Sequence, residues 1–291
     1  MNCKCAGIVL YNPDIDRLIE NYKAISKQVD DVILVDNNSN NFNEIIFKFN
    51  NISNVTILRN EENKGIAAAL NQICEEAKKL KYDWVYLLDQ DSISSPTIIN
   101  SYSRYVSNEN LALTTPYIID TNKTNFKEYQ NLKLSGISVV NWAITAGSLV
   151  RLDVWEKIGQ FDEELFIDTV DIDYSIRLKI NGYQQYRVNS EYILQEVGKA
   201  EPTFLFRPHK DNAGKWTLKR YFRTNHSLIR QYYMVRNNII LVKKYKKYRS
   251  VVKGIIFLSF YIFSKIVFEN NRGKLIKEIA KGIRDGIKYV V

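Results

Sequence analysis

The sequence is poor in the residues that build disulfide frameworks and soft metal sites. Its 291 residues include only three cysteines, Cys3, Cys5 and Cys74, and two histidines, His209 and His226. An odd number of cysteines without framework spacing argues against a disulfide-stapled secreted fold. Cys3 and Cys5 are also too close in sequence for the usual zinc motif, and few histidines are available to complete one.

Long hydrophobic runs are missing as well. The N-terminal run, Ala6 to Tyr11, is too short for a secretory signal, so it predicts a buried first strand and a cytoplasmic protein. A later run, Gly254 to Ser264, has eleven residues between Lys253 and Lys265, whereas a spanning helix needs about 20. That run predicts a helix that lies in the membrane interface or packs within a helical hairpin.

Charge is distributed unevenly along the chain. The net charge is +9, but the segment from Lys199 onward holds 22 basic and 5 acidic residues, against 19 basic and 27 acidic residues before it. The basic segment also interleaves Tyr and Phe with Lys and Arg in a pattern that favours helices. Such a surface suits an anionic partner, either membrane lipid, nucleic acid or a phosphorylated substrate.

The first hundred residues alternate short apolar runs with helical patterns. This alternation predicts an α/β fold with a parallel sheet buried on both faces. The predicted strands are 6–11, 32–35, 55–58 and 84–88. The predicted helices are 15–25, a short one around 45–49, and 66–80.

Polar clusters follow three of these strands. They are Tyr11-Asn12-Pro13, Asp36-Asn37-Asn38-Ser39 and Asp89-Gln90-Asp91-Ser92. Because ligands bind at the carboxyl ends of parallel strands, we expect the three clusters to share one edge of the sheet.

Asp89 and Asp91 form a two-carboxylate motif directly after a strand. Hard cations such as Mg²⁺ and Mn²⁺ prefer carboxylate oxygen and are often shared with substrate phosphates. The motif therefore predicts a metal site that neutralises a diphosphate, although an isolated Asp-X-Asp is more often a solvated turn.

Two further clusters suit a nucleotide. Asp36 is placed to accept a hydrogen bond from a pyrimidine N–H, or it forms an ordinary Asx turn. The segment Asn63-Lys64-Gly65 precedes a helix, so its backbone N–H groups and Lys64 face phosphate. Asn63 is also a natural N-cap of that helix, and the two roles are compatible.

Asp171 is the candidate general base for a hydroxyl nucleophile. Isoleucines recur every four residues from Ile172, which predicts a helix that starts near Asp168 and ends at Gly182. In the structural alternative, Asp168 is the N-cap and Asp171 stabilises the positive end of the helix, which would keep Asp171 ionised. Asp173 and Arg177 are four residues apart and are expected to pair on the surface of the helix.

Taken together, these motifs resemble the inverting family 2 glycosyltransferases with the GT-A fold, and within them the rhamnosyltransferase-like branch. The resemblance covers about residues 4–245. The motifs that carry it are Tyr11-Asn12-Pro13, Val35-Asp36-Asn37-Asn38-Ser39, the segment from Asn63 to Asn71, Leu88-Asp89-Gln90-Asp91-Ser92, Thr145-Ala146-Gly147-Ser148, the segment from Phe166 to Asp173, Arg230-Gln231-Tyr232-Tyr233 and Arg236-Asn237.

The resemblance implies a role for each matching residue. Tyr11 and Asp36 would contact the base, and Asp89 the ribose or diphosphate. Asp91, with Asp89, would bind Mg²⁺ or Mn²⁺, and Asp171 would be the catalytic base. Asn63 and Lys64 complete the expected donor site, and Trp142, Gly147 and Asp168 are weaker candidates for the acceptor or sugar pocket.

The implied fold is a Rossmann-like, mostly parallel sheet flanked by helices, with a helical, basic and aromatic C-terminal extension. Residues 1–200 would form the catalytic domain, with the nucleotide-sugar half at about 1–95 and the acceptor half at 96–200. Residues 201–291 would bind the cytoplasmic face of the inner membrane or form an interface between helices, as in a homodimer.

The implied reaction is inverting transfer of L-rhamnose from dTDP-L-rhamnose to a hydroxyl of a glycan or lipid-linked acceptor. A UDP-sugar donor, a nucleotidyltransferase and a nucleic-acid-binding protein are the alternatives, and no nucleic-acid motif is recognisable. One departure from the family concerns the metal, because many relatives have His where this chain has Gln195.

Overall fold

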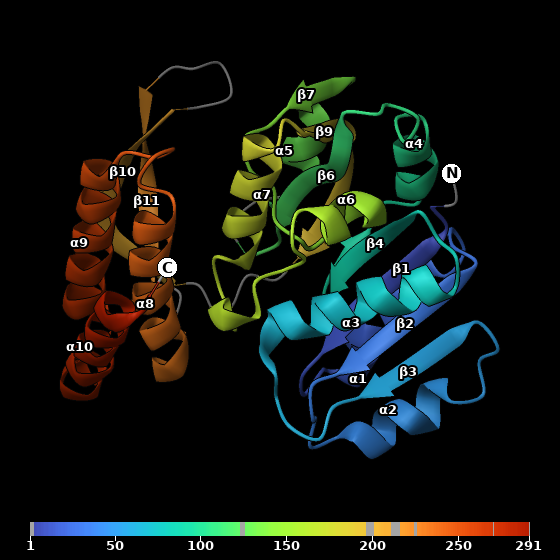
Figure 1. Ribbon diagram of the computed structural model, residues 1–291, viewed down its shortest axis with the longest axis horizontal. Coiled ribbons are helices and arrows are strands. Elements are labelled where there is room, and N and C mark those ends of the chain that lie inside the picture. Colours follow the sequence, from blue (N-terminus) through green and yellow to red (C-terminus); the bar gives the residue numbers. More distant parts are fainter. Residues whose placement is uncertain are drawn as a thin grey trace. The chain divides into compact units, whose positions relative to one another are not determined.

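The computed structural model divides into two compact units, residues 1–196 and 197–291 (Figure 1). Each unit has its own core, and each is described separately. The structure describes residues 3–122, 126–195, 201–210, 216–223, 226–269 and 271–290.

The N-terminal part of the first unit confirms the predicted alternation of strands and helices. Its strands are β1 Cys5–Leu10, β2 Asp31–Asp36, β3 Val55–Arg59 and β4 Trp84–Asp89. Its helices are α1 Ile15–Ile25, α2 Phe42–Phe49 and α3 Gly65–Lys79. The four strands are parallel, in the order β3-β2-β1-β4. Their continuous apolar runs follow from burial on both faces of the sheet.

The sheet then continues with strands of mixed direction. The added strands are β5 Ile93–Ser94, β6 Leu111–Asp120, β7 Ile137–Val139, β8 Ser148–Arg151 and β9 Gln184–Gln195. The helices among them are α4 Ile98–Ser103, α5 Phe126–Asn131, α6 Leu152–Lys157, the 3-10 turn η1 Glu163–Leu165 and α7 Val170–Ile180. β8 runs antiparallel to β4 and continues the sheet toward β6, β9 and β5.

The core of this unit lies on both sides of the sheet. Trp84 and Tyr86 of β4 are fully buried, as are Ile8 and Leu10 of β1. The alanine-rich helix α3 packs so closely on β1 that a Cβ added at Gly7 would lie 2.1 Å from the Ile73 side chain. Close packing of this kind fixes the position of the N-terminus of α3 relative to the strand ends.

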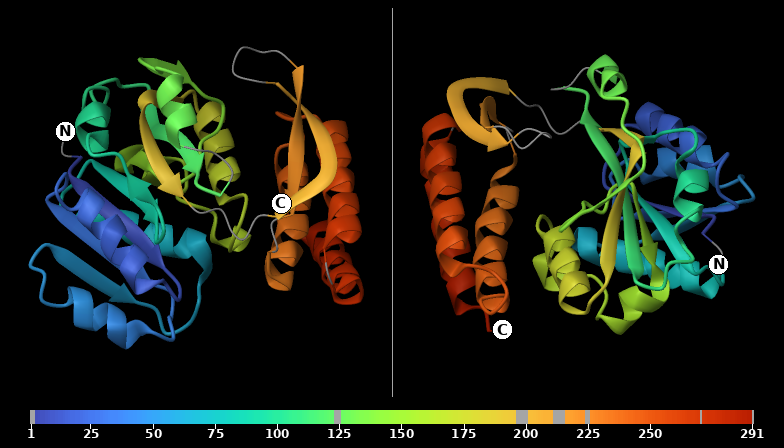
Figure 2. Two further views of the ribbon diagram at one scale, coloured as in Figure 1. Left: turned by 180° about the vertical axis from the view of Figure 1, so that it is seen from behind. Right: turned by 90° about the horizontal axis from the view of Figure 1, so that it is seen from above.

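The second unit confirms the predicted C-terminal helices and adds a hairpin that the sequence pattern did not predict. It begins with an antiparallel hairpin, β10 Glu201–Lys210 and β11 Trp216–Arg223, followed by α8 Leu228–Lys244, α9 Val251–Phe268 and α10 Arg272–Lys288 (Figure 2). The residues Tyr221-Phe222-Arg223, which the interleaved pattern assigned to a helix, lie on β11. Aromatic and basic residues that interleave along a chain are compatible with a strand as well as with a helix.

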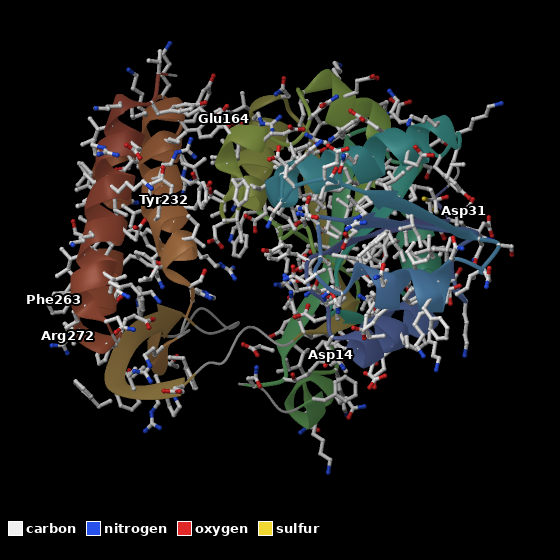
Figure 3. The ribbon with its side chains drawn as sticks, turned by 90° about the horizontal axis from the view of Figure 1, so that it is seen from below. Asp14, Asp31, Glu164, Tyr232, Phe263 and Arg272 are labelled. Carbon is white, nitrogen blue, oxygen red and sulfur yellow. The ribbon has the colours of Figure 1, made fainter. Side chains whose placement is uncertain are left out.

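Small residues bring two of these helices close together. A Cβ at Gly282 of α10 would lie 2.7 Å from the Tyr232 carbonyl oxygen, and one at Gly286 would lie 2.9 Å from the Arg236 carbonyl oxygen. Tyr232, labelled in Figure 3, also donates a hydrogen bond of 3.0 Å to Asp285. The packing of α8 against α10 is therefore specific. Helix α9 packs against another side of α8.

Helix α9 is longer than the apolar run that predicted it. Its 18 residues have a mean hydropathy of 1.9, which by length and composition is enough to cross a membrane, and 11% of them are buried. The predicted run of eleven residues ended at Lys265, but this lysine is buried and paired with Glu269 at 3.0 Å. Neutralisation of its charge allows the apolar helix to continue past it.

Candidate active site

The carboxyl ends of β1, β2 and β4 lie side by side at one edge of the sheet. In the register, Leu10 pairs with Asp36, and Val9 pairs with Asp89. The three polar clusters predicted from the sequence therefore start from neighbouring strand ends, as expected from the parallel order.

Tyr11 is held at this edge by the middle residue of the Asp-Gln-Asp motif. Its backbone N–H donates to Gln90 Oε1 at 2.8 Å, and Gln90 Nε2 donates to the Tyr11 carbonyl at 3.3 Å. The Tyr11 residue is 50% exposed, so its ring is free to contact a ligand. The next residue, Asn12, donates its N–H to Ser39 Oγ at 2.8 Å and so joins the first two strand ends.

Asp36 is fully buried, and its two carboxylate oxygens have different surroundings. Its Oδ2 accepts the Ser39 N–H at 3.1 Å and lies 4.0 Å from Arg59 Nε. Its Oδ1 is buried and has no hydrogen-bond partner among the described residues. A buried acceptor without a partner is costly in the free protein, and a ligand N–H would relieve that cost. The Arg59 guanidinium is held in place 4.1 Å from the ring centroid of Phe42.

The segment before α3 is organised by Asn37. The Asn37 amide donates to the Gly65 carbonyl at 2.9 Å and accepts from Asn60 at 2.8 Å. Lys64, rather than Asn63, is the N-cap residue of α3, although Asn63 Oδ1 accepts the Gly65 N–H at 2.9 Å. Together these bonds fix the loop that presents the positive end of the helix.

This loop packs directly against the segment that leads into α7. Ile66 donates its N–H to the Phe166 carbonyl at 2.6 Å. Gly65 has a φ of +85°, and a Cβ there would lie 2.5 Å from the same carbonyl oxygen. Only glycine fits this position.

The segment leading into α7 carries three non-glycine residues in left-handed conformations. They are Phe166, Asp168 and Thr169, with φ of 52°, 61° and 63°. Such conformations cost of order 1 kcal/mol each and cluster at functional sites. They also place the start of the helix at Val170, with Thr169 as N-cap and no side-chain cap bond. The prediction that Asp168 caps the helix is therefore wrong.

Asp171 lies in the first turn of α7 and is partly buried. Burial, with a smaller contribution from the charge of Asp168, raises its pKa to about 6, and the Ile172 N–H, which donates to Oδ1 at 2.8 Å, acts in the opposite direction. Burial therefore outweighs the helix end, which was expected to keep this group strongly ionised. A carboxyl with a pKa near 6 is well matched to proton transfer near neutral pH.

The Asp173–Arg177 pair forms, but not on the surface. Asp173 is fully buried, and its carboxylate is 2.8 Å from Arg177 Nε. Arg177 also donates to the Ile158 carbonyl at 2.8 Å. The pair therefore fastens α7 to the end of α6.

The end of β9 approaches the Asp-Gln-Asp motif. Gln195 Nε2 donates to Asp89 Oδ2 at 2.8 Å, while the Asp89 and Asp91 carbonyls accept from Asn21 at 2.7 Å and from Arg17 at 3.1 Å. Within the described parts of the chain, no three His, Cys, Asp or Glu side chains gather in a group able to hold a metal. The oxygen donors available here are the carboxylates of Asp89 and Asp91 and the amide of Gln195.

The three weaker pocket candidates occupy different settings. Trp142 is 58% exposed, in a loop that Ser175 of α7 holds through the Ala143 N–H at 3.2 Å. Gly147 is buried with φ +77°, and its N–H donates to the Leu87 carbonyl at 2.7 Å. Asp168 is one of the left-handed residues beside Asp171. Trp142 and Asp168 are thus attached to α7, whereas Gly147 is enclosed by the sheet.

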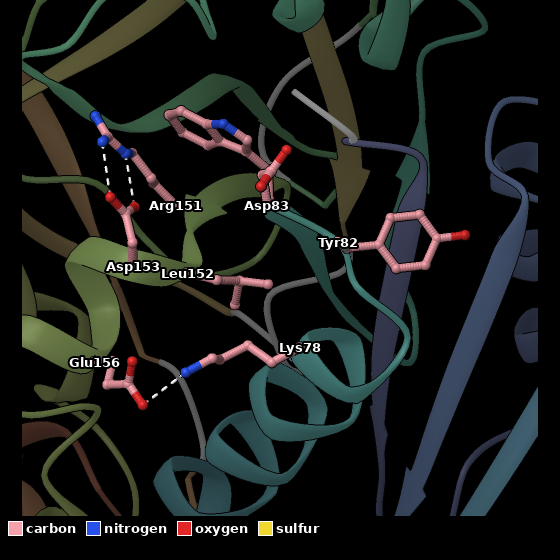
Figure 4. A pocket seen from close by; sticks show the side chains of 8 residues that line it. Lys78, Tyr82, Asp83, Arg151, Leu152, Asp153 and Glu156 are labelled. Carbon is pink, nitrogen blue, oxygen red and sulfur yellow. Dashed lines mark hydrogen bonds and ion pairs between the residues drawn. The ribbon is translucent and has the colours of Figure 1, made fainter.

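One hollow of about 290 Å³ lies away from these residues, at the amino end of β4. Two ion pairs cross it, Arg151 with Asp153 at 2.7 Å and Lys78 with Glu156 at 2.6 Å (Figure 4). Four of its charged side chains are paired with each other in this way, and none of the predicted site residues lines it, so the hollow is not a candidate site.

Two buried polar residues that support the site, Glu191 and Asn71, could not be recognised from local sequence patterns. Glu191 of β9 accepts hydrogen bonds from Ser95, Thr97 at 3.0 Å and Ser101 at 2.5 Å, and so anchors the segment that follows the Asp-Gln-Asp motif. Asn71 of α3 donates to the Phe161 carbonyl at 3.0 Å. Each of these two residues lies within an ordinary strand or helix pattern, which gives no indication of its role.

Comparison with known proteins decides the family. Residues 5–170 match the family model described as Glycosyl transferase family 2. The chain belongs to this family. It is therefore a glycosyltransferase, as the motifs predicted, and the nucleotidyltransferase alternative is wrong.

Two curated relatives of the glycosyltransferase are named as rhamnosyltransferases. It is 26% identical to the dTDP-rhamnosyl transferase RfbF of Shigella flexneri, over 98% of this chain and 95% of the relative. It is 21% identical to the rhamnosyltransferase WbbL of Escherichia coli strain K12, over 65% of this chain and 75% of the relative. The predicted likeness to the rhamnosyltransferase branch is confirmed.

Solved structures confirm the GT-A fold of the glycosyltransferase. S. aureus TarS 1–349 aligns with a TM-score of 0.57 at 13% identity, over 97% of this chain and 80% of that one. GalNAc-T7 with UDP, GalNAc and Mn²⁺ aligns with a TM-score of 0.54 at 15% identity, over 67% of this chain and 44% of that one. This chain thus spans less than half of the GalNAc-T7 chain, and at these identities the likeness concerns the fold.

Proposed function

We propose that this glycosyltransferase moves L-rhamnose from dTDP-L-rhamnose to a hydroxyl of a cell-surface glycan or lipid-linked acceptor, with inversion at the anomeric carbon. The observation that carries the proposal is the similarity to RfbF, a dTDP-rhamnosyl transferase, along 98% of the chain. This similarity continues beyond the family segment, residues 5–170, along nearly the whole chain.

Asp36 supports recognition of a thymine or uracil base. Its buried Oδ1 has no hydrogen-bond partner in the described part of the chain, and these bases carry an N3–H donor where cytosine has an acceptor. A site built to accept a hydrogen bond discriminates strongly against a ligand that lacks the donor. The half-exposed ring of Tyr11 is available to stack on the base.

The donor diphosphate is assigned to the edge between α3 and the Asp-Gln-Asp motif. Lys64 and the N-terminus of α3 supply positive charge, and the Asn37 bonds hold that loop in place. Asp89, Asp91 and the Gln195 amide are hard oxygen donors that fit Mg²⁺ or Mn²⁺. A bound cation would neutralise charge on the leaving nucleoside diphosphate.

Asp171 is the proposed base that takes the proton of the acceptor hydroxyl. With a pKa of about 6 it is mostly ionised at pH 7.5, yet basic enough to accept a proton in the transition state. Trp142 and Asp168, which are attached to the same helix, would line the acceptor side. Direct attack by the activated hydroxyl on the face opposite the leaving group gives inversion.

A donor screen tests this proposal. The purified protein would be incubated with dTDP-L-rhamnose or UDP-sugars, each with Mg²⁺ or Mn²⁺, and thermal stability and release of nucleoside diphosphate would be measured. Stabilisation and turnover with dTDP-L-rhamnose are expected. Turnover confined to a UDP-sugar would replace the donor assignment and leave the mechanism intact.

We also propose that the protein works at the cytoplasmic face of the inner membrane and associates with it peripherally. The support is the excess of 22 basic over 5 acidic residues from Lys199 onward, which suits anionic lipid. The alternative role for the same region is an interface in a homodimer.

A further inference from the structure

Helix α9 exposes one continuous apolar face. Val252, Ile256, Phe260 and Phe263 follow one another along the helix at intervals of three or four residues, and they are 65%, 62%, 43% and 61% exposed. Ile255 and Phe257 flank them and are more than half exposed. The sequence from Gly254 to Ser264 contains no charged residue. A contiguous apolar surface of this kind marks a contact with a membrane or a partner.

The opposite side of α9 is already used inside its own unit. Leu258, Tyr261 and Ile262 pack on the core formed with α8 and α10. Lys265 is 3% exposed and pairs with Glu269 at 3.0 Å, and Tyr261 donates a hydrogen bond to Gln231. One face of the helix is therefore packed within its own unit, and the other, called the open face below, is exposed.

These packed neighbours exclude a simple spanning arrangement. An 18-residue helix is about 27 Å long, close to the thickness of the hydrocarbon layer. However, α10 packs in the same bundle, and its exposed cations would then enter the hydrocarbon at high cost. Those cations are Lys274, Lys277, Lys281, Arg284 and Lys288. Of these two helices, α9 can meet lipid through its outer face while α10 stays in water.

Charge and shape around the open face suit an anionic bilayer. Exposed cations precede the face at Lys246, Lys247 and Arg249, Lys253 is next to its first residue, and Arg272, labelled with Phe263 in Figure 3, follows it. Beside the face, α8, α9 and α10 enclose an apolar hollow of about 340 Å³, lined by Val242, Ile255, Leu258 and Ile287. An apolar, phenylalanine-rich face with cations close to it suits a helix that lies in the interface of an anionic membrane.

We propose that α9 lies parallel to an anionic phospholipid bilayer and inserts the Val252–Ile256–Phe260–Phe263 face below the headgroups. The inference rests on the proposed membrane-surface role and specifies how it is achieved. The bundle stays on the surface, and the bilayer contact is made by one side of a single helix.

Sedimentation of the full chain with vesicles of phosphatidylglycerol and phosphatidylethanolamine tests the face. The double variant F260S/F263S should bind at least tenfold more weakly, because it loses two apolar anchors. The matched control is F47S, since Phe47 of α2 is 81% exposed in the other unit, and its vesicle binding should be unchanged. Unfolding temperatures of all three proteins report whether each variant folds.

A depth probe tests the orientation. All three native cysteines are buried, so a thiol-reactive fluorophore would label S259C, on the exposed side of α9, selectively. Vesicles should shift its emission to the blue, whereas the same probe on K277C, on the exposed side of α10, should remain in water. Blue shifts at both positions would overturn in-plane insertion in favour of a spanning or fully embedded bundle.

The other outcomes are equally decisive. A dimer in solution that F260S/F263S dissociates, with no vesicle binding by either protein, would assign the face to a second copy of the chain. Equal vesicle binding by F260S/F263S and the unaltered chain would also overturn the proposal. Transfer to a soluble acceptor should be the same in both proteins, so failure of the membrane proposal and failure of the proposed reaction are separate results.

Discussion

The side-chain amide of Gln195 donates a hydrogen bond of 2.8 Å to the carboxylate of Asp89. The last residue of β9 thereby meets the last residue of β4, although 106 positions separate them. Because the Nε2 group of the amide donates to Asp89, we propose the side-chain Oε1 of Gln195 as a neutral oxygen donor to the metal.

Replacing this amide should change the preference for metal. We expect Gln195→His to favour Mn²⁺ over Mg²⁺ by about tenfold relative to the unaltered chain, because imidazole suits the softer ion. Titration of each metal in the presence of dTDP would measure it. Gln184→His, at the opposite end of the same strand, is the control. Identical metal preferences in all three proteins would remove Gln195 from the proposed site.

Asp171→Asn should abolish proton transfer and leave donor binding in place. We expect the turnover number to fall by about 10²–10⁴, with the affinity for dTDP changed less than twofold. Asp153→Asn is the matched control, because Asp153 is also in the first turn of a helix but lies at the opposite edge of the sheet. Near-normal turnover by Asp171→Asn would refute its role as the base.

The same carboxyl predicts a dependence of stability on pH. Its folded pKa of about 6 lies above the ordinary value of 3.8. The protonated carboxyl therefore contributes stability that is complete below about pH 4 and is lost as the pH rises through 6. Asp171→Asn removes the cost of the buried charge, so it should raise the free energy of unfolding by at most about 3 kcal/mol at pH 8. Urea unfolding at pH 4.5 and 8 should show the advantage shrinking at the lower pH.

Activity should follow the opposite trend. Since the proposed base must be ionised, the turnover number should decline as the pH falls below about 6. A pH–rate profile measured with saturating donor would show this limb. A flat profile between pH 5 and 8 would contradict the assignment.

Gly65→Ala should disturb the contact between α3 and the segment that leads into α7. The added Cβ would lie 2.5 Å from the Phe166 carbonyl oxygen, at a φ of +85°. We expect a loss of more than about 2 kcal/mol of stability, together with weaker nucleotide binding. Gly182→Ala has a similar φ of +80° but open space around it, so only the backbone strain of about 1 kcal/mol should appear. Equal losses in the two variants would show that the contact is unimportant.

Asp36→Asn should weaken recognition of the base. We expect roughly tenfold lower affinity for dTDP and UDP and a smaller difference from CDP, because an amide can donate to cytosine as well as accept. Calorimetric titration of the three nucleotides would measure both effects. Asp31→Asn, at the other end of the same strand, should leave all three affinities unaltered.

Most of the parallel half of the fold could be predicted, because each strand is a short apolar run with a polar residue at its end. Asp36 and Asp89 were placed correctly by this local rule. The meeting of Gln195 with Asp89 could not be predicted, since it depends on the path of β9 through the sheet. The left-handed Phe166, Asp168 and Thr169 also escaped prediction, because tertiary contacts such as the bond from Ile66 to Phe166 contribute to the conformation of this segment, and a local pattern carries no information on them.

The local sequence pattern also predicted the burial of the Asp173–Arg177 pair incorrectly. The spacing of Asp173 and Arg177 predicted their pairing correctly, but spacing alone carries no information on whether a helix face meets solvent or protein. The β10–β11 hairpin was missed for a related reason, since aromatic and basic residues alternate in strands as readily as in helices.

The two attachments of α3 have a consequence for protein engineering. Ile66 and Asn71, on one helix of the proposed nucleotide half, bond to Phe166 and Phe161 in the proposed acceptor half. In a chimera that takes only residues 1–95 from a relative, the two partners of each of these hydrogen bonds would come from different proteins. Exchange of donor specificity would therefore require residues 161–166 to be transplanted together with the nucleotide half.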